Sequence, residues 1–425
     1  MHGKDGIPYD VLVIGGGPAG STAAALLAEY GREVIVLEKA VHPRFHIGES
    51  LLPRNLAIFD RLGVRDEIHA MGVLKPGAEI VSDVSGCSTD FSFATGIDRA
   101  FTYSYQVRRA DFDALLLANA RRQGATIAEC TRVTKVAIKP GTARACVTAQ
   151  QEDGTIRYFM PRFVLDASGR DTFLAGQLRL RRTDKNNNTA AVYAHFRNVI
   201  GRDGDMLGCI SLHLAEDGWF WLIPLPDGIM SVGFVGTQAA FKRRTGSLDE
   251  FFTRRIHDSP TVYARMRNAQ RVSDVMSAGN YSYRARTCWG DGYMLIGDAF
   301  AFVDPIFSTG VLLAMTSGSL GAEVAHAWLE DIARGRRMAQ RAERQLCRGM
   351  DRLNWLIYRI NTPVLRYLLL SPKNRLRMRD GLVSILAGNM QPGLAMTLPL
   401  TAFKATYYML QALSRLRVSL PEAQP

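Results

Sequence analysis

The chain has 425 residues, of which 47% are hydrophobic and 22% are charged. This is the composition of a folded globular protein, and it excludes a disordered chain, a fibrous repeat and a small binding module. The formal net charge of +12 favours anionic ligands or partners, such as phosphorylated cofactors, acidic carrier proteins or anionic lipid, but no basic tract is interleaved with aromatic residues as in nucleic-acid-binding proteins.

The cysteines and the N-terminal residues indicate in which compartment the protein is expected and whether it binds a metal. Six cysteines lie far apart without a C-x-x-C pair, so the sequence predicts neither a metal site nor a disulfide framework. The N-terminus lacks the basic-then-apolar plan of a signal peptide, and no run of about 18 uncharged apolar residues occurs. We therefore expect a cytoplasmic protein that holds no metal and does not span a membrane.

The first predicted elements are a strand, a glycine turn and a helix. The apolar run 11–14 predicts the strand, and an alanine-rich segment after the turn predicts the helix. Gly15 permits the tight turn, and Gly17 lets the backbone approach a pyrophosphate. Gly20 lets the helix pack against the strand, and Ala19 lies beside the phosphates at the helix start.

A second predicted strand supplies the acid that this pattern requires. The apolar run 34–37 ends in Glu38 and Lys39, about 20 residues after the glycines, where a carboxylate binds the ribose hydroxyls of a dinucleotide. We therefore expect Glu38 and Lys39 to lie beside the cofactor. The pattern predicts a Rossmann-like βαβ unit, but it does not distinguish NAD from FAD.

Later stretches favour FAD. A strand that ends in Asp298 is followed by Pro305 and by a Ser-Thr-Gly turn that enters a helix at Gly310. These residues resemble the ribityl- and pyrophosphate-binding segment of FAD monooxygenases of the hydroxybenzoate hydroxylase type. The segment 163–169 resembles the middle strand of that family, and Arg109 corresponds to its flavin-lining arginine. The resemblance implies that these side chains and the backbone at Gly310 bind FAD.

The order of the motifs predicts a discontinuous arrangement of domains. The FAD-binding domain is expected to consist of residues 1–74, 100–175 and 286–335. A substrate domain fills the gaps with residues 75–99 and 176–285. Within it, three alternating runs predict an antiparallel hairpin sheet: residues 208–214, 218–225 and 229–237. The expected fold class is α/β, with a Rossmann-like FAD domain, an antiparallel-sheet substrate domain and a helical C-terminal region.

The C-terminal region, residues 336–425, is expected to form helices that carry apolar faces between arginines. Breaks are expected at four prolines: Pro363, Pro372, Pro392 and Pro399. These helices either pack over the substrate domain or form a surface of their own. Such a surface would receive a lipid-like or carrier-bound substrate, or would rest peripherally on the inner face of a membrane.

The strand expected at 218–225 carries two of the five tryptophans two positions apart. The period of two places Trp219 and Trp221 on one face of the strand. Together with Ile223 and Pro224 they match every fixed position of the WxWxIP motif of flavin-dependent halogenases, and the chain resembles that family.

Two further segments support this resemblance. Segment 45–53 contains Glu49 and Ser50 and resembles the IGES segment that these halogenases place beside the flavin. Segment 304–310 resembles their halide-side loop. The resemblance extends from about residue 9 to about residue 324, and the C-terminal region is less distinctive.

The resemblance implies a role for each of these residues. The two indoles and the rigid Ile223-Pro224 step would form a wall that keeps an organic substrate away from the oxygen-activating flavin but admits a halide. The amides of Thr309 and Gly310, at a helix start, would hold chloride or bromide. The family's lysine, which directs the resulting hypohalous acid to the substrate, corresponds to Lys75.

Two neighbouring features refine this assignment. Pro76 restricts the backbone of Lys75 to an extended form and so fixes its direction. An ammonium group there could donate a hydrogen bond to the leaving oxygen, or the amine could form a haloamine. Phe307 occupies the place where free-tryptophan halogenases carry a glutamate that assists the lysine. We therefore expect a phenol, a pyrrole or an acyl-carrier-tethered aromatic group as substrate.

The sequence also predicts a protein partner and leaves alternative functions open. A second glycine fingerprint for NADPH does not occur, so a separate flavin reductase is expected to supply reduced FAD. One alternative is a lipid-alkene reductase resembling geranylgeranyl reductases, which share the glycine and Gly-Asp motifs. An aromatic hydroxylase and a non-catalytic flavin-binding partner in a biosynthetic complex are the others. The doubled tryptophan and Ile223 favour the halogenase.

Overall fold

Apolar runs that are continuous rather than alternating place the first strands inside a parallel sheet. In the computed structural model, β1 (Ile7–Ile14) lies between β2 (Val34–Leu37) and β10 (Ile156–Asp166), and both pairings are parallel. The structure describes residues 6–138, 143–184, 189–279, 282–390 and 393–416, so the outer ends of the predicted domains, 1–5 and 417–425, lie outside the described residues.

This first sheet has the strand order β19-β20-β10-β1-β2-β7. An antiparallel hairpin of β8 and β9 continues from β10. The flanking strands are β7 (Thr126–Ala128), β8 (Thr131–Ala137), β9 (Cys146–Gln151), β19 (Trp289–Gly290) and β20 (Tyr293–Leu295).

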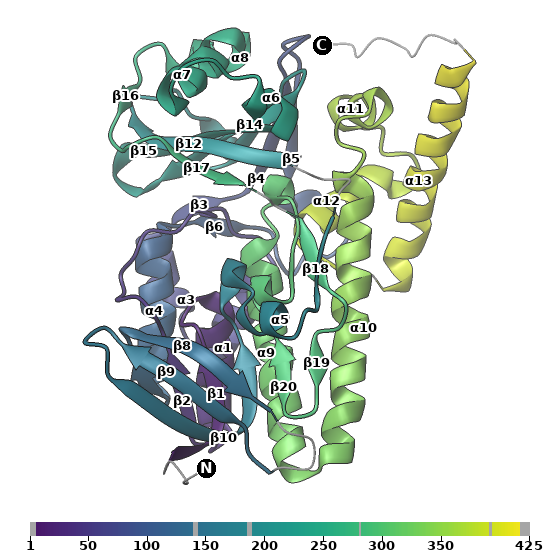
Figure 1. Ribbon diagram of the computed structural model, residues 1–425. Coiled ribbons are helices and arrows are strands. Elements are labelled where there is room, and N and C mark those ends of the chain that lie inside the picture. The colour runs from purple at the N-terminus through teal and green to yellow at the C-terminus, as the bar shows by residue number, and fades with distance from the viewer. Residues whose placement is uncertain (1–5, 139–142, 185–188, 280–281, 391–392, 417–425) are drawn as a thin grey trace.

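Helices cover the first sheet. The helix α1 (Pro18–Glu29) packs between α4 (Arg109–Arg122) and α9 (Gly310–Glu330), and α10 (Ile332–Ile357) runs along α9 (Figure 1). Gly318 of α9 allows this close packing, because a Cβ there would lie 2.5 Å from the carbonyl oxygen of Ala19. A side chain at that position would push α9 away from the strand-turn-helix unit.

A second sheet lies above the first (Figure 1) and has the order β16-β12-β15-β14-β13-β4-β5, with β17 beside β12. Its strands are β4 (Gly77–Ser82), β5 (Ser88–Ser92), β12 (Thr189–Arg197), β13 (Ile210–Leu214), β14 (Gly218–Leu225), β15 (Ile229–Thr237), β16 (Gln270–Arg271) and β17 (Met276–Gly279). The three expected strands are present as β13, β14 and β15, and they pair in antiparallel fashion.

One pairing in this sheet differs from the expectation. β4 and β13 run parallel, so the second sheet is mixed rather than wholly antiparallel. The strands β7 to β10 of the first sheet lie between β5 and β13 in the chain. A short hairpin forces two neighbouring strands to run antiparallel, whereas a connection of this length allows them to run parallel. The overall α/β class, with two sheets and a helical C-terminal region, is confirmed.

The two faces of β14 belong to different cores. Trp219 and Trp221 face the larger hydrophobic core, whereas Phe220 packs in a separate core beneath the short helices of the second sheet. There the ring of Phe220 lies 4.9 Å from that of Phe234. These helices are α6 (Gln238–Lys242), α7 (Leu248–Asp258) and α8 (Pro260–Met266).

Short elements connect the two sheets. β3 pairs with β6, and β11, β18 and β21 form a three-stranded sheet. The connecting strands are β3 (Val73–Lys75), β6 (Ser104–Gln106), β11 (Arg181–Thr183), β18 (Tyr283–Ala285) and β21 (Ala301–Phe302). The neighbouring helices are α2 (Asn55–Leu62), α3 (Arg65–Met71) and α5 (Phe173–Gln177).

The C-terminal region continues from α10 with α11 (Pro363–Leu370), α12 (Met378–Leu386) and α13 (Leu394–Arg415). Pro363 is the first residue of α11, where a proline is well tolerated. The break expected at Pro399 is wrong, because α13 continues through it. Pro399 has no N–H to donate, so the only helical hydrogen bond that is lost is the one to the carbonyl of Ala395, an exposed residue in the first turn of α13. Pro392 lies outside the described residues.

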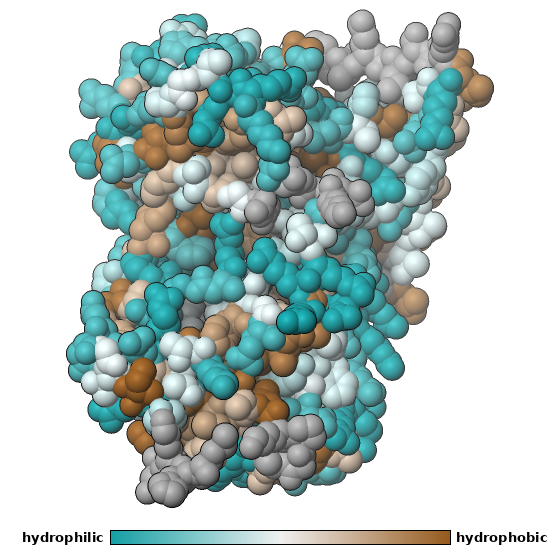
Figure 2. Space-filling view, viewed as in Figure 1, coloured by the Kyte–Doolittle hydropathy of each residue, from teal (hydrophilic) through white to brown (hydrophobic). Residues whose placement is uncertain are grey.

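The surface of α13 is unusually apolar for an outer helix. Hydrophobic residues lie at both ends of α13 along the edge of the molecule in Figure 2. Even so, no helix within the described ranges is long and apolar enough to cross a membrane.

The separation of the two cores can be tested with Phe220→Ala. Removing this buried ring should lower the free energy of unfolding by about 3–5 kcal/mol, because a cavity remains in the core under the second sheet. Urea unfolding measures this loss, and flavin content should stay unchanged because Phe220 faces away from the first sheet. Loss of flavin at unchanged stability would contradict the two-core arrangement.

Candidate functional site

A cavity of about 420 Å³ lies where the carboxyl ends of β1, β2 and β10 meet one face of β14. A crevice at this edge of an open α/β sheet is the usual place for a ligand. All but one of the predicted cofactor residues line this main cavity, namely Gly15, Gly17, Ala19, Glu38, Lys39, Glu49, Ser50, Arg109, Asp298, Pro305 and Gly310. The exception is Gly20, which lies behind the turn.

Each glycine of the turn is required for a different physical reason. Gly15 has φ +101°, and a Cβ on Gly20 would lie 2.0 Å from the carbonyl oxygen of Gly15. Both positions therefore require glycine for the turn and for its packing. Gly17 faces open space, since the nearest atom to its Cβ position is a guanidinium nitrogen of Arg44 at 3.9 Å. The start of α1 is thus left accessible to an anionic group.

Glu38 closes the other side of this turn. Its carboxylate accepts hydrogen bonds from the backbone N–H of Gly16 at 2.7 Å and of Ala40 at 2.9 Å. Each carboxylate oxygen keeps a further lone pair for a ribose hydroxyl. Lys39 points outward and forms an ion pair with Asp171, so it contributes positive charge at the rim.

Arg109 holds the segment that the sequence placed beside the flavin. Its guanidinium group forms a bidentate, buried pair with Asp113, at 2.8 and 2.9 Å. It also donates to the carbonyl oxygens of Ile47 and Gly48, at 3.0 and 3.3 Å. Arg109 therefore fixes the backbone just before Glu49. Burial, together with the positive charge of Arg109, lowers the pKa of His46 to about 4.

Glu49 has a partner that the sequence analysis missed. Nε2 of His195 lies 2.7 Å from one carboxylate oxygen of Glu49, while the other oxygen is buried without a hydrogen bond in the described part of the chain. His195 comes from β12, so this contact ties the second sheet to the IGES-like segment. Arg44, His46 and Arg170 also line the cavity. His46 lies within the IGES-like segment, Arg44 directly precedes it and Arg170 directly follows segment 163–169, but no local pattern indicates His195.

Asp298 lies at the opposite wall. Burial raises the pKa of this carboxyl to about 6, with Arg109 and Arg170 acting in the opposite direction. Within the residues that the structure describes, its carboxylate makes no hydrogen bond, although it lines the cavity. The hydroxyl groups of a polyhydroxylated chain would donate hydrogen bonds to this carboxylate.

These features fit FAD. The open backbone at Gly17 suits a pyrophosphate, the spare acceptors of Glu38 suit a ribose, and the unpaired oxygens of Glu49 and Asp298 suit further hydroxyl or ring donors. Within the described ranges, no cluster of histidine, cysteine or acidic side chains could hold a metal ion.

The segment before α9 forms a rigid loop at one end of the cavity. The side chain of Asp304 accepts hydrogen bonds from the N–H of Ile306 at 3.2 Å and from the hydroxyl of Thr189 at 3.0 Å. Gly310 lines the cavity, and a Cβ there would meet nothing within 4 Å. Thr309 is buried and does not line the cavity with its side chain, so it can offer only its backbone N–H.

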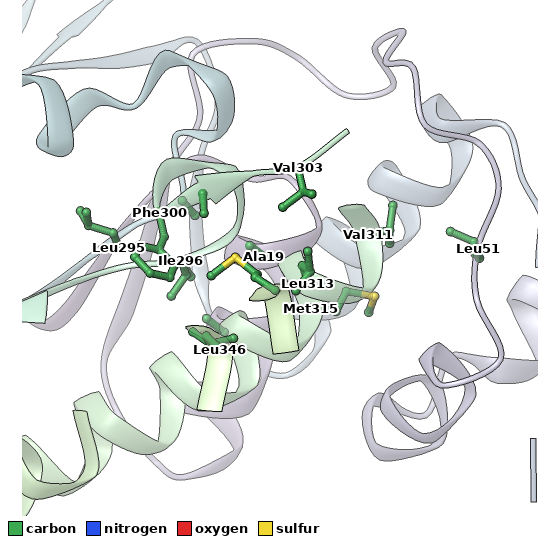
Figure 3. Close-up of a cluster of buried hydrophobic side chains, with 14 of the residues drawn as sticks. Ala19, Leu51, Leu295, Ile296, Phe300, Val303, Val311, Leu313, Met315 and Leu346 are labelled. Carbon is green, nitrogen blue, oxygen red and sulfur yellow. The ribbon is translucent and has the colours of Figure 1, made fainter. Parts of the chain in front are cut away.

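Packing behind this loop fixes the first turns of α9. Val311, Leu313 and Met315 belong to a buried cluster with Ala19 of α1 and with Leu51 (Figure 3). The helix start and its free N–H groups are therefore held in one place relative to the glycine turn.

The tryptophan pair forms a wall of the main cavity. Trp219, Trp221 and Ile223 line it from β14, and the two indole rings lie 5.9 Å apart. The indole N–H of Trp221 donates to the hydroxyl of Ser231 at 3.1 Å. Gly233 makes room for this ring, because a Cβ there would lie 2.2 Å from it. Pro224 is half-buried and is not among the lining residues.

Lys75 is buried, although a lysine before Pro-Gly usually lies in solvent. It ends β3, which pairs with β6, and only 1% of its surface is exposed. Its Nζ donates to the hydroxyl of Ser50 at 2.9 Å and to the carbonyl of Leu51 at 3.0 Å. Lys75 does not line the main cavity, but Ser50 does. The amine therefore lies directly behind a residue of the cavity wall.

Lys75 has no acidic partner among the described residues. Its Nζ lies 5.4 Å from the ring of Phe93, and Phe307 is buried near the helix start. Burial without a counter-charge lowers the pKa of Lys75 to about 7. At neutral pH the amine is thus poised between its charged and neutral forms.

Comparison with known proteins agrees with this geometry. The family described as FAD binding domain matches residues 8–327. A tryptophan 2-halogenase of Chondromyces crocatus is 37% identical over 319 residues, which are 73% of this chain and 60% of that protein. A chlorinase of peptidyl-carrier-bound pyrrole-2-carbonyl groups from Pseudomonas fluorescens is 31% identical over 74% of this chain and 75% of its own length.

Solved structures show the same fold. A flavoprotein/dehydrogenase from Cytophaga hutchinsonii has a TM-score of 0.86 and 28% identity, with 96% of this chain and 98% of that chain covered. The myxobacterial chondrochloren halogenase has a TM-score of 0.79 and 28% identity, with 98% and 99% covered.

Gly17→Leu should test the phosphate end of the cavity. The Cβ itself fits, but the larger side chain would occupy the space left for a pyrophosphate, so we expect FAD affinity to fall by about a hundredfold or more while the apoprotein remains folded. Fluorescence titration with FAD measures this. Gly176→Leu, at an exposed site with nothing within 4 Å of its Cβ position, is the matched control. Equal affinities in the two variants would contradict the assignment.

Lys75→Met should change stability in a pH-dependent way. The folded protein lowers the pKa of Lys75 from 10.5 to about 7, so between these values the unfolded chain binds more protons. The burial cost is therefore complete below pH 7 and disappears as pH rises towards 10.5. Urea unfolding of the apoproteins should show Lys75→Met to be the more stable at pH 6, with the difference shrinking by pH 10. A difference independent of pH would contradict the lowered pKa.

Proposed function

Because the chain belongs to the FAD-binding family of the flavin-dependent halogenases, we propose that it halogenates an aromatic substrate with reduced FAD, oxygen and chloride or bromide. The observation that carries this proposal is Lys75, an amine with a pKa near 7 that is hydrogen-bonded to Ser50 directly behind the wall of the flavin cavity. A halogenase needs such a group to deliver the halogen beyond the flavin.

Most residues of the main cavity serve to hold the cofactor. Gly15 and Gly17 shape the pyrophosphate site, Glu38 binds the ribose, and Arg109 positions the segment before Glu49. When bound, reduced FAD and oxygen supply the oxidising equivalent that converts halide to hypohalous acid. The backbone N–H groups of Thr309 and Gly310, at the start of α9, bind the halide.

The wall formed by Trp219, Trp221 and Ile223 separates organic substrates from the flavin. The two rings and the aliphatic side chain cover one face of the cavity, and Ser231 fixes the indole of Trp221. An aromatic substrate cannot pass this wall, whereas hypohalous acid is small enough to reach Ser50. Pro224, behind the wall, restricts the strand backbone and keeps Ile223 in place.

Lys75 then transfers the halogen. The neutral amine attacks the halogen of hypohalous acid, the N–X bond forms as the O–X bond breaks, and the hydroxide leaves with a proton of the amine as water. The ring carbon of the substrate next takes the halogen, and its proton returns to the nitrogen. Burial favours the neutral form that this step requires. Ser50 and the carbonyl of Leu51 orient the amine.

The substrate is an electron-rich aromatic group, either free or tethered to a carrier protein. The Pseudomonas fluorescens relative acts on a pyrrole-carbonyl group bound to a peptidyl carrier protein. Phe307 occupies the position where free-tryptophan halogenases carry an assisting glutamate, which favours a phenol or pyrrole over free tryptophan. The Chondromyces crocatus relative, in contrast, is named for tryptophan. A separate flavin reductase supplies the reduced FAD. The comparisons favour neither a lipid-alkene reductase nor an aromatic hydroxylase.

The proposal is tested with photoreduced enzyme that is mixed with oxygen in the presence or absence of bromide or chloride. Reoxidation of the flavin should depend on halide, and a panel of phenols and pyrroles should yield halogenated products. Lys75→Met should lower product formation by about a hundredfold or more and leave halide-dependent reoxidation intact. Absorbance and mass spectrometry measure the two effects.

Lys242→Met serves as the control, since Lys242 is exposed on α6 and no residue of α6 lines the cavity. Reoxidation that is indifferent to halide would contradict the halogenase proposal. Full product yield from Lys75→Met would remove Lys75 from the transfer step. Rapid reduction of bound FAD by NADPH alone would contradict the need for a separate reductase.

A further inference from the structure

The positive charge of the chain is concentrated at one end. Residues 336–425 contain 15 of the 52 lysines and arginines but only four of the 40 acidic residues. This segment therefore carries a net charge of +11, and the remaining residues carry +1. The catalytic cavity lies within the nearly neutral part, so its cofactor does not account for this excess.

Part of this charge forms a stripe on α10. Arg337, Arg341, Arg344 and Arg348 follow one another at intervals of four, three and four residues, which places them on one face of the helix. All four are exposed. Within the described part of the chain, none of them forms an ion pair or a hydrogen bond through its side chain. An uncompensated row of this kind attracts an extended anionic surface.

The outer face of α13 is apolar. Over its 22 residues the helix contains no acidic residue and only two basic ones, Lys404 and Arg415. Leu394 is 93% exposed, and Leu398 and Met409 are 63% and 57% exposed. Apart from Arg415, the other exposed positions carry uncharged residues: Ala395, Thr397, Thr401, Ala405, Tyr408, Ala412 and Leu413. Such a face is costly in water unless something covers it.

The stripe and the apolar helix share one side of the molecule. The arginine row of α10 continues through Arg352, Trp355 and Arg359, and α13 covers this upper part. Trp355 contacts the rings of Tyr407 and Tyr408 at 5.2 and 6.1 Å. The two helices run in the same direction (Figure 1). The uncovered arginines therefore lie along α10 just beyond the first residue of α13.

We propose that this combined face, the exposed side of α13 and the arginine stripe of α10, docks on an anionic lipid surface. Apolar side chains of α13 enter the boundary between headgroups and acyl chains, and the arginines contact lipid phosphates. Arg415, which is exposed at the end of α13, lies where its charged end can reach the headgroups. The ammonium group of Lys404 instead lies over the ring of Trp355, 5.2 Å from the ring centroid. The long, acid-free face matches a lipid surface better than a protein partner, which would require directional polar contacts in the interface.

Vesicle flotation of the full-length, FAD-loaded protein tests this. The protein should bind vesicles made of equal parts phosphatidylglycerol and phosphatidylcholine and should not bind vesicles of phosphatidylcholine alone. The double variant Leu398→Asp with Met409→Asp should lower binding by about tenfold or more, and Arg337→Gln with Arg341→Gln and Arg344→Gln by a similar factor. Added salt should weaken binding.

Ile200→Asp with Leu207→Asp is the matched control, because these residues are similarly exposed, at 57% and 67%, but lie outside the C-terminal region. Equal loss of binding in the control would overturn the proposal, as would binding independent of lipid charge or no binding at all. A dimer that Leu398→Asp dissociates would assign the face to a second copy. Binding to an acidic carrier protein but not to vesicles would assign it to that partner.

Discussion

The burial of a lysine amine without an opposite charge is the constraint on which the rest of the site depends. Lys75 reaches only a hydroxyl and a carbonyl, so the protein bears the cost of desolvating its charge. Three neighbouring features hold it there: the β3–β6 pairing, the bridge of Ser50 to Gln106, and the carbonyl of Leu51. Because Ser50 also lines the flavin cavity, the same contact that retains the amine links it to the cofactor.

Much of this arrangement was readable from local sequence. The glycine turn and the strand with Trp219 and Trp221 follow short patterns whose physical cause lies within a few residues, whereas Lys75 was assigned only through the resemblance to the halogenase family. Contacts between distant segments did not follow in this way. His195 meets Glu49 across 146 positions, and no period or turn signal marks a pair so far apart. The parallel pairing of β4 with β13 was missed for the same reason, since it depends on the path of a long connection.

Two surfaces of this chain thus have separate physical characters. The cavity is recessed between the two sheets, has acids and arginines balanced around it, and offers fixed backbone N–H groups. The C-terminal face is open and contains few acidic residues. It is strongly basic along α10 and apolar along α13. The cofactor cavity and the basic, apolar face therefore belong to different parts of the chain. The continuation of α13 through Pro399 keeps the apolar face on one uninterrupted helix.

The tryptophan wall on β14 also depends on Gly233, which lies on the neighbouring strand β15. The indole of Trp221 occupies the volume in which any side chain at position 233 would have to lie. The two positions therefore cannot vary independently: a residue larger than glycine at 233 requires a smaller one at 221, which would remove part of the cavity wall. The shape of this wall thus depends on β15 as much as on β14, and a larger residue at position 233 has to be accompanied by a smaller one at position 221.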